Sequence, residues 1–461
     1  MDNEHYRHWA HRAVDFTADY LDGLRERPVR PDVAPGETAA LLPASPPDEA
    51  EPMAEIFADF ERIVPGGLTN WQHPRFLAYF PANASRASMI AEHLATGIAV
   101  QCMLWETSPA ATEMEARMVD WMRQAVGLPE GFSGTIQDTA SSSTLCAVLT
   151  MRERALGWRG NTQGLSGQGR LRIYASPQNH SSIRKACWIA GIGDENLVSV
   201  ETDDNFAMKP EALRAAIAAD RAAGHLPAGV IAVVGGTGIG ASDPVAEVLE
   251  IARAEGLYSH IDAAWAGIAM ICPELRALWQ GAEMADSIVL NPHKWLGAQA
   301  ECSVQLLRDP ADQVRTLGLR PDYLQTLGQS EIVNFSEWSP ALGRRFRALK
   351  LWFVLRAYGL DGLRAMIRNH IGWAEAACER LRSHPKLEIV TEPRLSLFTF
   401  AHVDGEDATR ALIEAINRDG TTYLTQTMHE GRFVIRFVVG QFDAEEADIE
   451  AAVAAIERLA G

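Results

Sequence analysis

The chain has 461 residues, of which 47% are hydrophobic and 22% are charged, proportions typical of globular proteins and unlike those of disordered or collagen-like chains. Its 60 acidic residues outnumber its 42 basic ones, and the net charge of −18 disfavours nucleic acids and anionic membranes as partners. The length predicts two or three domains.

Cysteine spacing and hydrophobic runs do not indicate export or a membrane span. The six cysteines are scattered without a CxxC pair, and neither a signal-like N-terminus nor a run of about 20 apolar residues occurs. We therefore expect a cytoplasmic protein. His5, His8 and His11 recur at three-residue steps, but without an evident carboxylate shell they are more typical of a solvated helix face than of a metal site.

The first 85 residues form a predicted appendage. Aromatic and apolar residues between Tyr6 and Leu24 recur every three or four positions, which predicts an amphipathic helix. Pro-rich stretches at 27–37 and 41–52 follow and indicate extended connections. We expect residues 1–85 to pack on a partner subunit.

Between about 110 and 310, helical stretches alternate with short apolar runs, a pattern that predicts βαβ units and a mostly parallel sheet. Ligands of such sheets bind beyond the carboxyl ends of the strands. The predicted strands are LRIYAS (171–176), VIAVVGG (230–236), LYSHIDAAW (257–265), SIVLNPHKW (287–295) and CSVQLL (302–307).

The pattern changes after about residue 345. A helical segment over 345–381, followed by strand-like runs within 387–403 and 433–440, predicts a smaller α+β domain at 346–461. The large domain would span 86–345. It includes a Gly-, Pro- and Ser-punctuated segment at about 318–340, either a mobile active-site cover or a linker.

The run VVGGTGIGA (233–241) loosely matches a dinucleotide-binding fingerprint. We expect the next helix to begin near residues 242–244, so that the glycines do not open directly onto a helix. A loop that lines a planar ligand explains the small residues equally well, and Thr237 could contribute a hydroxyl to it.

Two charged residues close strand-like runs. Lys294 ends SIVLNPHK, where an amine among apolar residues suits Schiff-base chemistry, although a surface lysine is the commoner reason for this position. Asp262 ends a neighbouring run and could keep the nitrogen of a pyridine ring protonated, or it could cap a helix.

Two further segments suit a phosphorylated, planar ligand. TASSST (139–144) places hydroxyl residues at a helix start, where backbone N–H groups and the helix dipole favour a phosphate. His180 follows the strand LRIYAS and could stack on a ring or move a proton, although a structural histidine is the default interpretation.

Together, TASSST, QNHSS (178–182), HIDAAWAG (260–267) and NPHKW (291–295) resemble the group II pyridoxal-phosphate amino-acid decarboxylases, in the aromatic-L-amino-acid decarboxylase branch that includes aldehyde synthases. The likeness extends through HPRFLAYFP (73–81) and fades in the C-terminal domain. It implies an α/β fold of pyridoxal-phosphate fold type I, like that of aspartate aminotransferase, in an obligate homodimer with shared active sites.

The resemblance also implies roles for individual residues. Cofactor binding falls to Thr139, Ala140, Ser141, His180, Thr237, Asp262, Ala264, Asn291, His293 and Lys294, with Lys294 forming the Schiff base. Substrate contacts fall to Trp71, Tyr79, Phe80, Pro81, Ala82, Gln101 and Met103. Ala82 replaces a hydroxyl residue of the family, and Gln101 and Met103 stand where a partner subunit usually supplies apolar and aromatic groups.

The largest departure lies in the 318–340 segment, where animal decarboxylases carry a tyrosine thought to protonate Cα and this chain has Phe335. A phenyl ring cannot donate that proton, and plant relatives with phenylalanine here resemble aldehyde synthases. Tyr323 could substitute, and His180 could relay the proton. We expect decarboxylation of an aromatic L-amino acid to its amine. The alternative is oxidative deamination to an aryl acetaldehyde, ammonia and hydrogen peroxide, while intact Lys294, Asp262 and His180 disfavour a non-enzymatic scaffold.

Overall fold

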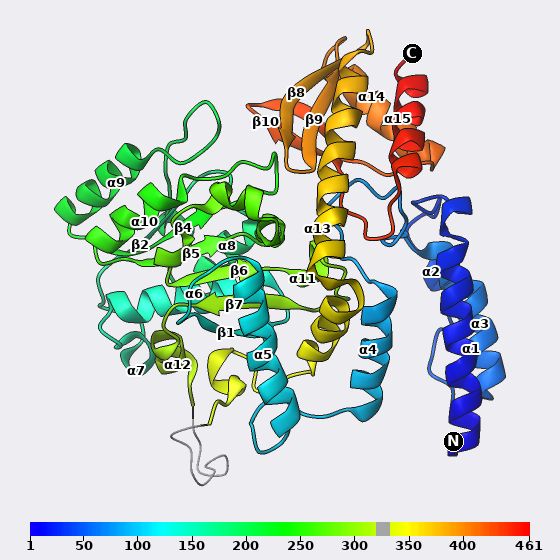
Figure 1. Ribbon diagram of the computed structural model, residues 1–461, viewed down its shortest axis with the longest axis horizontal. Coiled ribbons are helices and arrows are strands. Elements are labelled where there is room, and N and C mark those ends of the chain that lie inside the picture. The colour runs from blue at the N-terminus through cyan, green and yellow to red at the C-terminus, as the bar shows by residue number, and fades with distance from the viewer. Residues whose placement is uncertain (320–331) are drawn as a thin grey trace. The chain divides into compact units, whose positions relative to one another are not determined.

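The computed structural model describes residues 1–319 and 332–461. The chain divides into two compact units, one of Ala82–Ile371 and one of Met1–Pro81 with Gly372–Gly461 (Figure 1). Tyr323 and most of the 318–340 segment lie outside the described residues.

The larger unit is built on a seven-stranded sheet in the order β1-β7-β6-β5-β4-β2-β3. Neighbouring strands from β6 to β3 are parallel, while β7 runs antiparallel to both β1 and β6, so that β1 points the same way as β6. The mostly parallel sheet predicted from the sequence is confirmed. The strands are β1 (Ser133–Gln137), β2 (Leu171–Ala175), β3 (Leu197–Ser199), β4 (Leu226–Val233), β5 (Tyr258–Asp262), β6 (Ser287–Leu290) and β7 (Ser303–Leu307).

Helices cover the sheet, and β5, β6 and β7 are buried along their whole length, as expected for strands packed on both faces. Apolar residues of α6 and α8 form one core with β2, β4 and β5. The helix α10 begins at Val245, so the glycines of 235–240 do not open onto it, as predicted. The helices are α4 (Arg86–Ile98), α5 (Pro109–Ala125), α6 (Ala140–Ala155), α7 (Gly160–Gln163), α8 (Ser181–Ile189), α9 (Pro210–Ala222), α10 (Val245–Ala254), α11 (Pro292–Trp295) and α12 (Ala311–Leu317).

The smaller unit contains a four-stranded antiparallel sheet in the order β10-β11-β9-β8. Its apolar face packs on α14 and α15 around a core that includes Phe398, Phe400 and Phe437. The predicted α+β domain is thereby confirmed. Its elements are β8 (Leu387–Arg394), β9 (Leu397–His402), α14 (Glu406–Asp419), β10 (Thr425–His429), β11 (Arg432–Val438) and α15 (Glu446–Ala460).

The predicted N-terminal helix is α1 (Asn3–Asp22), followed by α2 (Glu37–Ala40) and α3 (Met53–Ile63). The aromatic face of α1 meets α3, with Trp9 5.5 Å from Phe57 and Phe16 5.1 Å from Phe60 between ring centroids. No residue of α1 is buried. Domain boundaries at 85 and 345, and docking of this segment on a partner, stay predictions.

The long predicted helix is α13 (Arg347–Arg382), which is interrupted at Gly359, where φ is +62°. Glycine tolerates this left-handed backbone without steric cost, so the helix kinks there. Among the described residues, no helix is both long and apolar enough to cross a membrane.

Candidate active site

The polar residues singled out in the sequence follow the carboxyl ends of five strands. Thr139 follows β1, His180 follows β2, Thr237 follows β4, Asp262 ends β5 and Lys294 follows β6. All five strands point the same way, so these ends meet at one edge of the sheet.

A cavity of about 200 Å³ lies at this edge. All ten residues predicted to bind the cofactor line it. Five further lining residues were not predicted to bind the cofactor, although all lie within the QNHSS, VVGGTGIGA and HIDAAWAG motifs: Ser182, Val233, Gly235, Gly236 and Trp265.

Lys294 lies in the four-residue helix α11, whose backbone is fixed from outside the helix. Asn83 donates its side-chain N–H to the Lys294 carbonyl (2.7 Å) and its backbone N–H to the His293 carbonyl (2.9 Å). The Cys302 N–H donates to Nδ1 of His293 at 3.1 Å. Asn83 and Cys302 therefore determine where the Lys294 amine enters the cavity, and the motifs gave no signal for either.

His180 lines the cavity and is the N-cap of α8. Its Nδ1 accepts the backbone N–H of Ser182 at 3.2 Å and lies 2.8 Å from the Ser182 hydroxyl. Desolvation lowers the pKa of His180, with Asp262 raising it and Lys294 lowering it. The ring is therefore neutral near pH 7, and because Nδ1 accepts, its proton is on Nε2.

Asp262 is buried at the end of β5, and its Oδ1 accepts the Ala264 backbone N–H at 3.2 Å. Its other oxygen accepts no hydrogen bond from the residues that the structure describes, so it is available to a donor in the cavity. A buried carboxylate here suits a cationic ring nitrogen, since opposite charge stabilises both ions.

The start of α6 suits an anion. Its N-cap is Thr139, whose side chain makes no capping hydrogen bond to the helix. Ala140 and Ser141 line the cavity at its first turn, where free N–H groups and the helix dipole attract a phosphate. Asn291 accepts the Ser303 hydroxyl through Oδ1 (2.7 Å), so its Nδ2 can act as a donor.

Phe335 is not among the residues that line this cavity. It lies in a short 3₁₀ helix (Phe335–Trp338), is 2% exposed and packs with Leu307, Val314 and Trp338. The Arg344 guanidinium lies 5.4 Å from its ring centroid. The ring thus belongs to the core next to β7.

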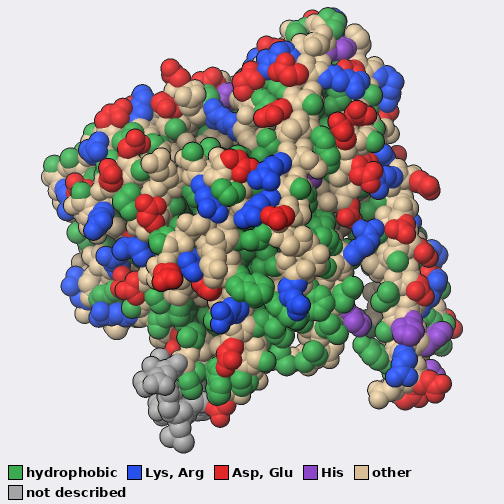
Figure 2. Space-filling model, in the orientation of Figure 1, with side chains coloured by type: hydrophobic (Ala, Val, Ile, Leu, Met, Phe, Trp, Pro, Cys, Tyr) green, Lys and Arg blue, Asp and Glu red, His purple; other side chains and the backbone are tan. Residues whose placement is uncertain are grey.

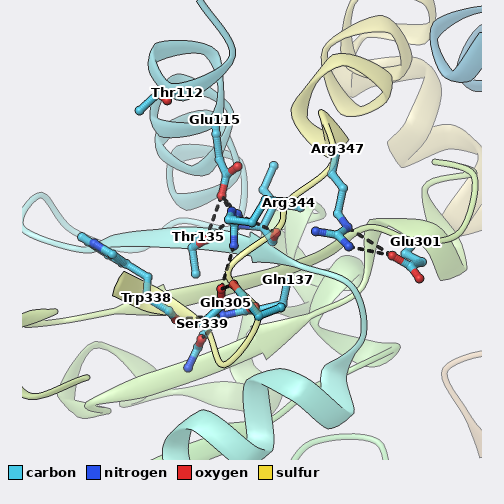
Figure 3. A network of polar contacts seen from close by, with 12 residues as sticks. Thr112, Glu115, Thr135, Gln137, Glu301, Gln305, Trp338, Ser339, Arg344 and Arg347 are labelled. Atoms are coloured by element: carbon cyan, nitrogen blue, oxygen red, sulfur yellow. Dashed lines mark hydrogen bonds and ion pairs between the residues drawn. The ribbon is translucent and has the colours of Figure 1, made fainter. Parts of the chain in front are cut away.

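A polar network holds this segment on the sheet (Figure 3). The Trp338 carbonyl accepts from the side chains of Gln137 (3.1 Å) and Gln313 (2.8 Å). Gln313 in turn pairs with Gln305 of β7 through two hydrogen bonds, of 2.8 and 3.0 Å.

The predicted substrate residues fall in both units. Trp71, Tyr79, Phe80 and Pro81 belong to the smaller unit, where the rings of Trp71 and Tyr79 stack 5.7 Å apart at 10°. In the larger unit, Gln101 accepts the Arg344 backbone N–H at 2.6 Å, and the Met103 carbonyl accepts that of Ser336 at 3.0 Å. Ala82 begins this unit.

The protein is an α/β protein whose cavity is lined by a lysine, a carboxylate and the start of a helix. These groups suit a phosphorylated pyridine cofactor. Residues 35–403 match the family model described as the pyridoxal-dependent decarboxylase conserved domain, and the chain belongs to that family. It is a carboxy-lyase that uses pyridoxal phosphate. The resemblance drawn from the motifs is confirmed.

Named relatives match nearly the whole length of the chain. Tryptophan decarboxylase 2 of Oryza sativa subsp. japonica is 38% identical over 98% of this chain and 94% of its own. Phenylacetaldehyde synthase of Arabidopsis thaliana is 37% identical over 98% and 95%. The crystal structure of Oryza sativa TDC with PLP and tryptamine superimposes with a TM-score of 0.96 at 34% identity, covering 100% of this chain and 98% of that one.

Proposed function

We propose that this protein decarboxylates an aromatic L-amino acid to the aryl amine and carbon dioxide, with Lys294 holding pyridoxal phosphate. The observation that carries the proposal is the single cavity that brings together Lys294, Asp262, His180 and the uncapped start of α6. Two relatives named for tryptophan decarboxylation and phenylacetaldehyde synthesis support an aromatic substrate.

Pyridoxal phosphate supplies a ring that withdraws electrons from the bond to the departing carboxylate. The residues present fit it: the start of α6 and Asn291 would hold the phosphate, and Asp262 would keep the ring nitrogen protonated. Lys294 would bind the cofactor through its amine. The small loop residues Gly235, Gly236 and Thr237 would leave room for a flat ring.

His180 would return the proton to Cα. Its proton is on Nε2, so donation from Nε2 must be accompanied by proton gain at Nδ1. The Ser182 hydroxyl, 2.8 Å away, would pass a proton to Nδ1 while it takes up another from solvent. Ser182→Ala should then lower kcat for amine release while the cofactor still binds. An unchanged kcat would exclude this relay.

We propose that Trp71, Tyr79, Phe80, Pro81, Ala82, Gln101 and Met103 contact the substrate. Trp71 and Tyr79 are stacked and about two-fifths exposed, and such a pair offers an aromatic surface to a ring. Trp71→Ala should raise KM for aromatic substrates more than Trp373→Ala, a change at a partly buried tryptophan of the C-terminal core.

The decisive experiment supplies the purified protein with tryptophan, tyrosine, phenylalanine or DOPA and quantifies carbon dioxide, amine and hydrogen peroxide. We expect amine and carbon dioxide in equal amounts. Lys294→Ala should lose both activity and the visible absorbance of the cofactor, whereas Lys185→Ala, on α8, should retain them. Activity retained in Lys294→Ala would overturn the assignment.

The second candidate product comes from the sequence, in which the apolar Phe335 replaces a proton donor of the animal decarboxylases, although this ring does not line the cavity. In that reaction the amino acid, dioxygen and water give the aryl acetaldehyde, carbon dioxide, ammonia and hydrogen peroxide. Peroxide equal to carbon dioxide in the same assay would establish the aldehyde reaction and exclude simple decarboxylation.

We further propose a homodimer with shared active sites. Ile90, Leu94 and Ile98 form a stripe on α4 and are 58%, 40% and 60% exposed, and hydrophobic side chains gather around α4 and α5 in Figure 2. Apolar patches of this kind mark interfaces. The wild-type mass measured by light scattering should be twice the chain mass, and Leu94→Asp should halve it. A monomeric wild type would contradict the proposal.

The cytoplasm is the proposed location. All six cysteines are buried free thiols, which fits a reducing compartment. Fractionation of the source cells tests this, and recovery with an extracellular or membrane fraction would overturn it.

A further inference from the structure

The residue after Lys294 is tied to a distant helix by one buried hydrogen bond. The indole of Trp295 is fully buried, and its Nε1–H donates to Nδ1 of His370 on α13 at 2.9 Å. The two rings are nearly parallel, with an interplanar angle of 13° and centroids 6.4 Å apart. His370 is itself 1% exposed.

This bond matters because α11 has only four residues and cannot hold itself in place. Asn83 fixes the helix through the backbone carbonyl of Lys294, and His370 fixes it through the side chain of Trp295, the last residue of the helix. Trp295 also packs on Trp265, which lines the cavity, with ring centroids 5.6 Å apart. The indole therefore connects α13 both to Lys294 and to the cavity wall.

The chemistry of His370 suits a fixed acceptor. Desolvation lowers its pKa to about 3, so the ring is neutral at every pH at which the enzyme would work. A buried indole N–H without a partner is costly, so removal of the acceptor should displace the indole.

We propose that His370 is a positioning residue for Lys294, acting through the Trp295 indole. The proposal rests on the proposed role of Lys294 in holding the cofactor. His370 lies 76 residues further along the chain and is not among the residues that line the cavity.

The test compares holoenzymes of wild type, His370→Leu and His370→Asn. Leucine removes the acceptor, whereas asparagine keeps an oxygen near the position of Nδ1. We measure the rate of cofactor release from its visible absorbance, and the yield of cofactor fixed on Lys294 by borohydride, mapped by peptide mass. His370→Leu should release cofactor about tenfold faster, as expected for one unsatisfied buried donor, and His370→Asn should recover most of the wild-type rate.

A double-variant cycle tests whether His370 acts through the Trp295 indole. In Trp295→Phe no donor remains, so adding His370→Leu should change the release rate less than twofold. Tyr174→Phe is the matched control, because it removes another buried hydrogen bond of the same unit, to Asp220 at 2.8 Å. It should lower stability without changing cofactor release.

The outcomes are distinct. Wild-type release in His370→Leu, equal acceleration in Tyr174→Phe, or an undiminished effect of His370→Leu in the Trp295→Phe background would each overturn the proposal. If wild type fixes no cofactor on Lys294, the proposed function fails and the role of His370 with it. If His370→Leu does not fold, His370→Asn and Trp295→Phe are compared instead. A wild-type rate of cofactor release in Trp295→Phe would overturn the proposal. Faster cofactor release in Trp295→Phe than in His370→Asn would support it.

Discussion

Arg344 and Glu115 form an ion pair in the interior of the larger unit, with 2% and 3% of their side chains exposed (Figure 3). Glu115 also accepts the Thr135 hydroxyl and the Ile136 backbone N–H, both at 2.7 Å. Arg344 reaches the Ile136 carbonyl at 3.1 Å and holds the segment that includes Phe335 against β1.

Removal of Arg344 alone should destabilise the protein more than removal of both members of this pair. Arg344→Met leaves Glu115 buried without its countercharge, which should cost about 3–5 kcal/mol of unfolding free energy. Arg344→Met/Glu115→Leu should recover part of that loss. Urea unfolding of the three proteins measures both effects. Arg368→Met, which breaks an exposed ion pair with Glu274, should cost less than about 1 kcal/mol of unfolding free energy. Equal losses of stability in Arg344→Met and Arg368→Met would contradict the prediction.

Phe335→Tyr tests whether the side chain at position 335, which lies in the core outside the cavity, determines which product forms. The new hydroxyl would enter an apolar cluster, so we expect a loss of about 1–3 kcal/mol in stability. The ratio of hydrogen peroxide to carbon dioxide should stay as in wild type, and as in the apolar control Phe335→Leu. A shift toward amine at unchanged stability would show instead that the ring leaves the cluster during turnover.

Gly235 and Gly224 offer a comparison at nearly equal backbone geometry, with φ of +75° and +77°. A Cβ at Gly235 would lie 2.5 Å from the Ala266 Cβ and 2.9 Å from the Trp265 ring, whereas at Gly224 nothing lies within 4 Å. Gly224→Ala should cost about 1–2 kcal/mol from the left-handed backbone alone. Gly235→Ala should cost more and weaken cofactor binding, because Trp265 lines the cavity. Calorimetry measures the stability of the two variants, and titration measures their affinity for the cofactor. Equal stability and equal affinity in both variants would contradict the prediction.

Asp243 predicts a pH dependence of stability. Its carboxylate accepts the backbone N–H groups of Val233 and Met208 at 2.8 Å each, and burial raises its pKa from 3.8 to about 6. Between these values the folded state binds the proton more tightly than the unfolded state, so stability falls as the pH rises. From pH 4 to 7, wild type should lose about 3 kcal/mol relative to Asp243→Asn.

Urea unfolding at pH 4, 5, 6 and 7 measures this difference. Asp361→Asn, which changes a fully exposed side chain, should run parallel to wild type. A constant difference between wild type and Asp243→Asn over the whole range would show that Asp243 titrates normally.

Much of the site was predictable because its signals are local. Lys294 and Asp262 close predicted apolar runs, and the ends of parallel strands meet at one edge, so these two residues could be paired from the sequence. The periodicity of apolar residues likewise predicted α1 and most of the strands of both sheets.

What could not be predicted depends on pairings between distant segments. The insertion of β7 antiparallel between β1 and β6 has no signature in its own residues, since a buried strand reads the same in either direction. The bond between His370 and Trp295, and the burial of Phe335 beneath Arg344, arise from packing that no single segment encodes.

The rate at which the buried thiols are alkylated reports how often the chain opens locally around them. Burial raises the pKa of both Cys302 and Cys146 to about 12, so an alkylating reagent reacts with either only after the chain has opened around it. The backbone of Cys302 supports His293 behind the cavity, while Cys378 lies in the core of the smaller unit. The alkylation rate of Cys302 would therefore report opening of the larger unit, and that of Cys378 opening of the smaller unit, without any engineered probe.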